Sequence, residues 1–157
     1  MSDIIQGLWI GDNLSTIERL SINSFLKNGH EFNLYLYKDL ETPAGTIIKD
    51  ANEILPENSI FYYGPAAGPS NGSVSSFSNL FRYTMLYKCG GYLVDLDVIC
   101  LKHFDFQDPY VFHNSHNGEI GSDIIKASIN SDAMKYAIDR CMEKDFNNLK
   151  HKEIGPC

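Results

Sequence analysis

Apolar and polar positions in the first part of the chain follow the order expected for a strand, a helix and a second strand. Residues 4–10 form a short apolar run that is typical of a strand. Ser15 and Glu18 have the spacing of a capping box, and apolar residues on a broad arc predict a helix from there to Gly29. Residues 32–37 alternate and are rich in aromatic side chains, which predicts a second strand. With their short connections, these elements predict an α/β domain with a parallel sheet.

The next part of the chain carries weaker signals. Residues 46–49 are expected to form a short strand, residues 50–55 a helical turn, and residues 60–63 are a further apolar run. Residues 64–76 are rich in Gly, Pro and Ser and have no periodic apolar face. This composition predicts a loop of the kind that often covers a ligand.

The second half begins with a helix, which is expected from Phe77 to a pair of glycines. Apolar residues surround its axis, so the helix is predicted to be buried on all sides. Residues 92–101 are nearly all apolar, which predicts a strand buried on both faces. A further strand is expected at residues 110–113, with a polar loop at 113–121. The apolar spacing then predicts an amphipathic helix from about 132 to 146.

The composition is that of one ordinary folded domain. The chain has 157 residues, of which 43% are hydrophobic and 21% charged, so it can bury a core. A formal charge of -7 argues against nucleic acid as a main partner, because phosphate binding begins with a basic surface. No apolar run approaches the ~20 residues that a transmembrane segment needs. The four cysteines form no C-x-x-C pair, which predicts reduced thiols in a cytoplasmic protein.

Two carboxylates, Asp95 and Asp97, interrupt the apolar run at residues 92–101. In a strand, residues two apart point to one side, so both carboxylates can face a common ligand. Mg²⁺ and Mn²⁺ prefer such oxygens, and a metal is how an acidic protein can hold an anionic diphosphate. Two carboxylates in an apolar strand incur a large desolvation cost unless they are paired or bind a metal. The context therefore favours a functional pair, with a solvated strand end as the alternative.

Three further residues are candidates for binding. Asn79 and Arg82 are three positions apart and share one face of the helix that precedes the two aspartates. A guanidinium in a buried helix needs a partner, either an anionic or hydroxyl-rich ligand or one of the aspartates in a structural ion pair. Trp9, the single tryptophan, sits at a strand end, where α/β sheets place a ligand crevice. It can stack on a base or anchor the core.

Other motifs are weak or absent. His113 and His116 have a spacing that a metal can use, but no third ligand is near in the sequence, so we expect a surface location. The chain contains no G-x-S-x-G, H-E-x-x-H, G-x-G-x-x-G or P-loop motif. Serine hydrolase, zinc protease, dinucleotide-binding and P-loop functions therefore lose support.

Three stretches together, residues 9–11, 78–83 and 90–97, resemble the DXD-containing sugar-binding region of family 32 glycosyltransferases. They are also similar to the glucosyltransferase domains of large bacterial toxins, which share the GT-A fold. The resemblance implies a GT-A type α/β fold, Rossmann-like, with a mixed, mainly parallel sheet. It further implies that residues 1–157 form a single donor-binding domain that is truncated at its C-terminal side. Members of the family extend well beyond a Gly-Pro dipeptide like the one at 155–156 of this chain.

The resemblance also implies roles for the donor-binding residues. Leu8 and Trp9 would line the nucleotide base, with Trp9 stacking on it, and Ser78 would lie near the nucleotide. Asn79 and Arg82 would bind hydroxyls of the donor sugar. Asn79 stands where the family usually has Asp, which weakens this match.

The two aspartates complete the implied site. Asp95 would lie near the ribose, the sugar and the metal, and Asp97 would ligate the metal, which is Mn²⁺ or Mg²⁺. The implied donor is a UDP- or GDP-sugar and the acceptor a glycan or another hydroxyl compound. Catalytic residues are not identified by the resemblance.

The implied function is hexosyl transfer that depends on a metal and retains the anomeric configuration, in polysaccharide biosynthesis. The first alternative is a non-catalytic remnant that keeps the nucleotide-sugar site. The second is a haloacid dehalogenase-like phosphatase in which Asp95 attacks phosphorus and Asp97 acts as acid and base. The phosphatase motif usually has Thr or Val where this chain has Ile99. It also normally lies at the start of its domain, whereas here it lies in mid-chain.

Overall fold

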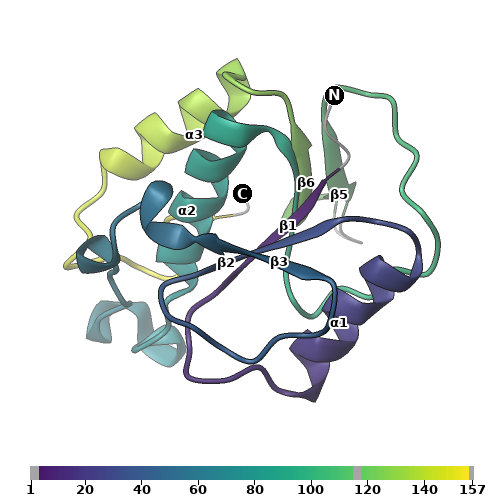
Figure 1. Ribbon diagram of the computed structural model, residues 1–157. Coiled ribbons are helices and arrows are strands. Elements are labelled where there is room, and N and C mark those ends of the chain that lie inside the picture. The colour runs from purple at the N-terminus through teal and green to yellow at the C-terminus, as the bar shows by residue number, and fades with distance from the viewer. Residues whose placement is uncertain (1–3, 115–117, 156–157) are drawn as a thin grey trace.

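Six strands form one sheet with helices on both faces in the computed structural model, which describes residues 4–114 and 118–155 (Figure 1). The strands are β1 (Ile5–Trp9), β2 (Phe32–Leu36), β3 (Thr46–Asp50), β4 (Gly91–Val94), β5 (Val111–Asn114) and β6 (Ile120–Ala127). The helices are α1 (Thr16–Lys27), α2 (Ser75–Cys89) and α3 (Asp132–Met142), with short 3-10 segments at Ala51–Glu53, Glu57–Ser59 and Pro65–Ser70. Helix α1 packs on one face of the sheet, and α2 and α3 pack on the other (Figure 1).

The order of strands across the sheet is β3-β2-β1-β4-β6-β5. The first four of these are parallel to one another, whereas β6 runs antiparallel to both β4 and β5. The expected mixed, mainly parallel sheet is therefore confirmed. The chain moves outward from β1 through β2 to β3 and then returns to place β4 on the other side of β1. This reversal is a topological switch point, where ligands bind in open α/β sheets.

Pairing around β1 leaves a gap at this switch point. All five residues of β1 pair with β2, but only Ile5 and Gln6 pair with β4. The carboxyl ends of β1 and β4 are thus not joined by a ladder of hydrogen bonds. Side chains that follow these two strands can therefore face a common crevice.

The first predicted elements are confirmed. The capping box forms, since the Ser15 side chain accepts a hydrogen bond from Ile17 N and the Glu18 carboxylate accepts one from Ser15 N at 2.6 Å. Helix α1 ends at Lys27, and Gly29 follows with a φ of 82°, which a glycine adopts without strain. Strands β1, β2 and β3 occupy the three expected ranges to within one residue.

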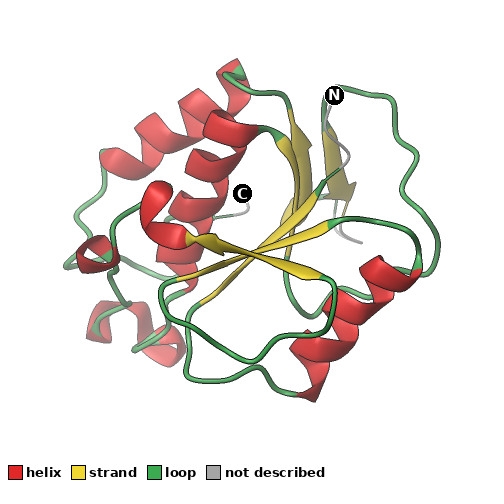
Figure 2. Cartoon of the chain, viewed as in Figure 1, coloured by secondary structure: helices red, strands yellow, loops and turns green. Residues whose placement is uncertain are grey.

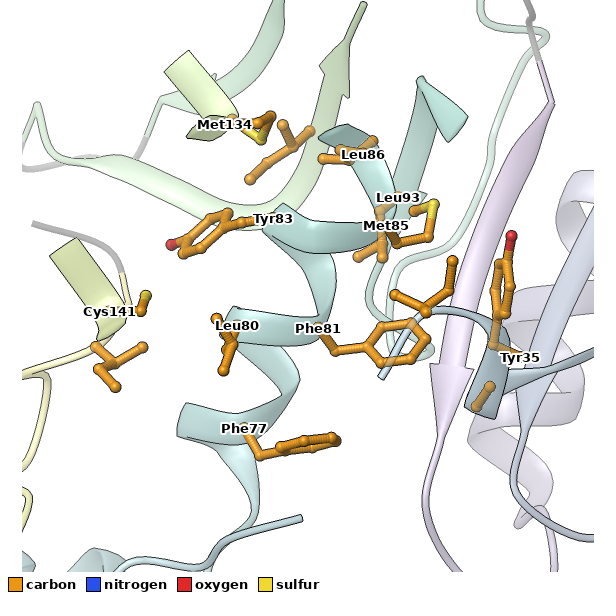
Figure 3. Close-up of a cluster of buried hydrophobic side chains, with 14 of the residues drawn as sticks. Tyr35, Phe77, Leu80, Phe81, Tyr83, Met85, Leu86, Leu93, Met134 and Cys141 are labelled. Carbon is orange, nitrogen blue, oxygen red and sulfur yellow. The ribbon is translucent and has the colours of Figure 1, made fainter. Parts of the chain in front are cut away.

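Helix α2 is buried on several sides, as its sequence predicts. It lies between the sheet and α3, and Figure 3 shows Phe81 directed toward Tyr35 of the sheet while Leu80 points toward Cys141 of α3. The ring centroids of Tyr35 and Phe81 lie 5.7 Å apart at an interplanar angle of 67°. Packing on both sides fixes the rotation of the helix about its axis, and with it the direction of the polar side chains that it carries.

The predicted strand at residues 92–101 is wrong beyond Val94. Strand β4 ends there, and the following residues form a turn that is closed by a hydrogen bond from Val98 N to Asp95 O at 3.2 Å. The long connection to β5 is a loop (Figure 2). Its apolar residues Leu96, Val98 and Cys100 pack in the core on the α1 side, and two serines of α1 hydrogen-bond to its backbone. Ser21 Oγ donates to Val98 O at 2.6 Å, and Cys100 N donates to Ser24 Oγ at 2.8 Å.

Strand β6 was not predicted, because a buried lysine hides its pattern. Lys126 is 2% exposed, donates to Phe106 O and lies 5.0 Å from the centre of the Tyr92 ring. A charged residue on the buried face removes the alternation by which a strand is recognised. The predicted polar loop at 113–121 is correspondingly shorter, and α3 ends at Met142 rather than near 146.

Several smaller expectations can be compared with the structure. The loop predicted at 64–76 contains the 3-10 segment Pro65–Ser70 and the start of α2. His113 is exposed, as expected, whereas His116 lies outside the described residues. Cys89, Cys100 and Cys141 are free thiols, and Cys157 also lies outside these residues. None of the helices described in residues 4–114 and 118–155 has the length and apolar character needed to cross a membrane.

Candidate functional site

Three adjoining cavities open along the carboxyl ends of β1, β2 and β4. The aspartate cavity, about 260 Å³, is lined by residues that include Leu8, Trp9, Glu18, Ser78, Asp95 and Asp97. The arginine cavity, about 440 Å³, is lined by residues that include Ser78, Asn79, Arg82, Asp95, His151 and Lys152. The tryptophan cavity, about 290 Å³, is lined by residues that include Trp9, Asp12, Tyr37, Lys38, Glu57 and Tyr62. All seven predicted binding residues therefore line one crevice, although they come from three separate parts of the chain.

The two aspartates stand on the turn after β4 and both line the aspartate cavity. Asp95 N donates to Asp123 O at 2.8 Å, which continues the pairing with the β6 strand one residue past Val94. Between the aspartates, Leu96 is buried and packs over Gly7, where an added Cβ would lie 2.8 Å from Leu96 Cδ2. This leucine anchors the turn in the core, so the carboxylates are held at the crevice without being part of a strand.

Arg82 forms an ion pair with Asp95 through Nη2 and Oδ1. The predicted structural partner of the guanidinium is therefore present. The arginine side chain is 5% exposed and the aspartate side chain 41% exposed, so the pair bridges the core and the crevice. Among the residues that the structure describes, Nε and Nη1 of Arg82 are buried and have no hydrogen-bond partner.

These two unpaired groups on Arg82 are the most informative feature of the site. A buried N–H group without an acceptor costs free energy, and the cost is larger when the group is charged. The guanidinium lines the arginine cavity, where an incoming molecule can supply oxygen acceptors. The ion-pair alternative for Arg82 is therefore confirmed, and binding of a ligand by its two other nitrogens stays a prediction.

The pKa of Asp95 is raised above its ordinary value, chiefly because burial withdraws the carboxyl group from water. The charged Arg82 opposes this shift, whereas the carboxylates of Asp97 and Asp123 add to it. An acid with a raised pKa binds its proton more tightly in the folded chain than in the unfolded one. The folded state therefore gains stability as the pH falls toward the ordinary value of 3.8.

This shift predicts a pH effect that the Asp95→Asn variant removes. From about pH 7 to about pH 4, the free energy of unfolding of the wild type should rise relative to that of the variant. Urea unfolding of both proteins across this range measures the difference, and titrating groups far from Asp95 cancel in the comparison. A difference that stays constant, or that falls as the pH is lowered, would contradict a raised pKa for Asp95.

The chemistry of Asp95 and Asp97 fits a hard divalent cation. Both residues offer carboxylate oxygens, which Mg²⁺ and Mn²⁺ prefer, and the Oδ1 atom of Asp95 is already bound by Arg82. No cluster of three or more His, Cys, Asp or Glu side chains suited to a metal occurs in residues 4–114 and 118–155. Magnesium is commonly held by one or two carboxylates together with water and substrate phosphates, so two carboxylates suffice for a metal that arrives with its substrate.

Trp9 belongs to the core and also borders the crevice, and its stacking on a base stays a prediction. Its indole is partly buried, packs against the core on the α1 side of the sheet, and also lines both the tryptophan cavity and the aspartate cavity. Nε1 donates to Asn13 O at 3.0 Å. An added Cβ at Gly11 would lie 2.9 Å from Nε1, so a side chain there would displace the ring. The indole is therefore held at the crevice by a local hydrogen bond.

Asn79 lines the arginine cavity, and one N–H of its side-chain amide is engaged by the protein. The Nδ2 group donates to Ile154 O at 3.1 Å, and the asparagine is 8% exposed. Ser78 also lines this cavity, and its hydroxyl donates to Val74 O at 3.3 Å within the helix. The expected roles of these two residues in donor binding stay predictions.

Several lining residues are not among the binding residues that the sequence predicts, and these include Glu18, Tyr62, His151 and Lys152. The first was recognised only as part of the capping box, and the second only as part of an apolar run. The last two lie after α3, in a stretch without any periodic pattern. No local sequence pattern identifies His151 and Lys152 as lining residues, because their position at the crevice depends on the packing of the segment after α3 against α2.

Comparisons with known proteins agree with this geometry. A family model described as "Glycosyltransferase sugar-binding region containing DXD motif" matches residues 18–118. Among solved structures, the chain is similar to "PaToxG Glycosyltransferase", with a TM-score of 0.65 and 18% sequence identity. That match covers 99% of this chain and 65% of the other, and at such identity it establishes the fold alone, in agreement with the expected GT-A type. No curated protein sequence matches the chain.

Proposed function

The chain belongs to the family of glycosyltransferase sugar-binding regions that contain a DXD motif, and from this premise we propose that it is the donor-binding domain of a metal-dependent glycosyltransferase. The observation that carries the proposal is Arg82, which is buried beside the DXD turn and has two N–H groups without an acceptor in the described residues. A sugar presents several hydroxyl oxygens close together, which are suitable acceptors for such groups.

The three cavities suggest how a nucleotide-sugar donor is accommodated. We assign the base to the crevice beside Leu8 and Trp9, where the indole offers a face for stacking. Ser78 lines both the aspartate and the arginine cavity, so we place it between the nucleotide and the sugar. The sugar then occupies the arginine cavity, where it accepts hydrogen bonds from Arg82. In this arrangement the diphosphate lies at the DXD turn.

Asp95 and Asp97 would hold the divalent cation, Mn²⁺ or Mg²⁺, together with diphosphate oxygens. A bound cation neutralises negative charge that develops on the leaving diphosphate. The contribution of the chain itself is to orient the donor. Arg82 holds the sugar through charged hydrogen bonds in a site that water reaches poorly, where such bonds are strong. Its pairing with Asp95 fixes the guanidinium relative to the DXD turn.

The remaining parts of the proposal rest on the family resemblance. We infer a UDP- or GDP-sugar donor, a glycan or other hydroxyl acceptor, and retention of the anomeric configuration. We likewise propose that residues 1–157 act as one donor-binding domain in the cytoplasm, in polysaccharide biosynthesis. The chain spans just under two thirds of the PaToxG chain that it matches. The second candidate is a module that binds the donor without transferring sugar.

Calorimetric titration with UDP-glucose and GDP-mannose, each with and without Mn²⁺, tests the proposal. We expect binding of at least one donor that becomes measurably tighter when Mn²⁺ is present. A folded chain that binds neither donor, nor free UDP or GDP, would contradict a working donor site. Where binding is found, release of free sugar from the bound donor distinguishes a transferase from a binding module.

Trp9 provides a separate and direct test. It is the single tryptophan of the chain, so intrinsic fluorescence reports on one ring. UDP or GDP should change this fluorescence in a saturable manner. Replacing Trp9 by leucine should weaken nucleotide binding about tenfold by calorimetry, because stacking of a base on an aromatic ring contributes ~1–3 kcal/mol. The Trp9→Phe variant keeps an aromatic face and should lose less. Equal affinity in all three proteins would exclude Trp9 from the base site.

A further inference from the structure

We propose that Asn79 is a positioning residue, which holds the segment 149–155 in place as a wall of the arginine cavity and does not itself bind the sugar. The family resemblance instead implies direct contact between this residue and sugar hydroxyls. The inference rests on the proposed function, because it names the donor sugar as the occupant of the cavity. The structural part of it, the attachment of the segment to α2, stands without that function.

The attachment is a buried contact between two distant parts of the chain. Asn79 Nδ2 donates to Ile154 O at 3.1 Å, across 75 positions of sequence. Both residues are buried, at 8% and 3% exposure, and Leu149 at the other end of the segment is 1% exposed. The two apolar side chains belong to the core that α2 and α3 share. The amide thus supplies the directional contact for a segment that packing alone holds less specifically.

The backbone of the segment comes unusually close to Asn79. A Cβ atom added at Gly155 would lie 2.7 Å from Asn79 Nδ2, a distance that real Cβ atoms essentially never show. Gly155 also has a φ of 145°, which side chains of L-residues rarely adopt. Only glycine allows this approach, so the sequence at position 155 fits a segment that is docked against the asparagine.

The docked segment supplies one side of the arginine cavity. His151, Lys152 and Ile154 line it together with Ser78 and Arg82 of α2. The segment is attached at a second point, where Ser70 Oγ and His151 Nδ1 lie 2.7 Å apart. Lys152 has a φ of 62°, which is uncommon for a residue other than glycine and costs free energy unless the surrounding structure imposes it. Release of the segment would therefore remove a wall of the cavity.

Asparagine at position 79 suits this role, whereas the aspartate that the family usually has at this position does not. The partner atom is a carbonyl oxygen, which only accepts hydrogen bonds, and Nδ2 is a donor. An ionised carboxylate at position 79 would place a second acceptor against Ile154 O and would repel it. The difference from the family pattern at this position is thus explained by the contact with the segment.

The Asn79→Asp variant separates the two interpretations. If Asn79 binds the sugar directly, the variant restores the usual residue of the family and should bind donor as well as the wild type or better. If Asn79 positions the segment, amide hydrogen exchange in residues 149–155 should become about tenfold faster, and the dissociation constant of the donor should rise by a similar factor. Asn23→Asp makes the same chemical change at an exposed position of α1 that lines none of the three cavities, and should alter neither quantity.

A second variant approaches the contact from the other side. Gly155→Ala leaves Asn79 unchanged but adds a methyl group where there is no room. Positioning predicts faster exchange and weaker donor binding here too, so unchanged exchange or unchanged donor affinity in this variant would contradict it. Thermal unfolding shows whether each variant is folded.

The possible outcomes separate this inference from the proposed function. The inference is overturned if exchange in residues 149–155 is unchanged in both variants, or if exchange accelerates while donor affinity stays the same. If the wild type binds no nucleotide sugar, the proposed function is contradicted. The claim that the segment forms a wall of a sugar site is then contradicted as well. The exchange measurement would still decide whether Asn79 holds the segment.

Discussion

Replacement of Asp97 by asparagine is expected to lower the rate of sugar transfer, or of donor hydrolysis, by at least about a hundredfold at saturating donor. Asparagine has nearly the shape of aspartate but lacks the charge that attracts a divalent cation. Asp97 is exposed and its side chain lines the aspartate cavity, so the change should leave the folded structure intact. The dissociation constant of Mn²⁺ in the presence of UDP should rise by a comparable factor.

The matched control for this prediction is Asp108→Asn. This aspartate lies on the loop between β4 and β5, is exposed, and lines none of the three cavities of the crevice. The control changes the net charge by the same amount, so it should retain wild-type rates and metal affinity. Equal rates for Asp97→Asn and the wild type, measured at limiting Mn²⁺, would remove Asp97 from the metal site.

Replacement of Arg82 by methionine should weaken donor binding by about a hundredfold, because the sugar loses its charged hydrogen-bond donors. It should also lower the free energy of unfolding by about 1–3 kcal/mol, because Asp95 loses its partner while it remains half-buried. Calorimetry with the donor measures the first effect, and urea unfolding measures the second.

Arg82→Lys distinguishes charge from geometry at this position. Lysine keeps the positive charge near Asp95 but cannot present two further N–H groups in the planar arrangement of a guanidinium. It should recover much of the lost stability and little of the donor affinity. The exposed Arg140, which pairs with Glu143, provides the matched control, since Arg140→Met should leave donor affinity unchanged. Full recovery of donor affinity in Arg82→Lys would show that the sugar does not use the guanidinium.

Local patterns account for the elements that were predicted well. The capping box at Ser15 and Glu18, and the apolar arc that follows, involve residues within one or two turns of helix, so their meaning does not depend on distant parts of the chain. The aromatic alternation that predicts β2 is equally local. The apolar run after Val94 shows the opposite case. Leu96, Val98 and Cys100 pack in the core on the α1 side, and periodicity cannot distinguish that environment from the interior of a sheet.

The sequence predicts the main residues of the crevice but not how they are arranged in space. Trp9, Arg82 and the two aspartates were identified because their residue types are unusual at strand ends, in a buried helix and in an apolar run. Their convergence follows from the strand order, which places β4 beside β1 at the switch point. The ion pair between Arg82 and Asp95 was one of two open alternatives, and the sequence could not show that two nitrogens of the guanidinium would remain unpaired.

The sequence alone therefore determined the α/β class, the parallel start of the sheet, the buried character of α2 and the residue types of the crevice. These properties depend on spacing along the chain and on the free energy of burying particular side chains. Only the tertiary structure decided that Asp95 and Asp97 stand on a turn, that β6 pairs with β4, and that the segment 149–155 reaches Asn79. These features depend on contacts between residues that are far apart in sequence, which no local pattern encodes.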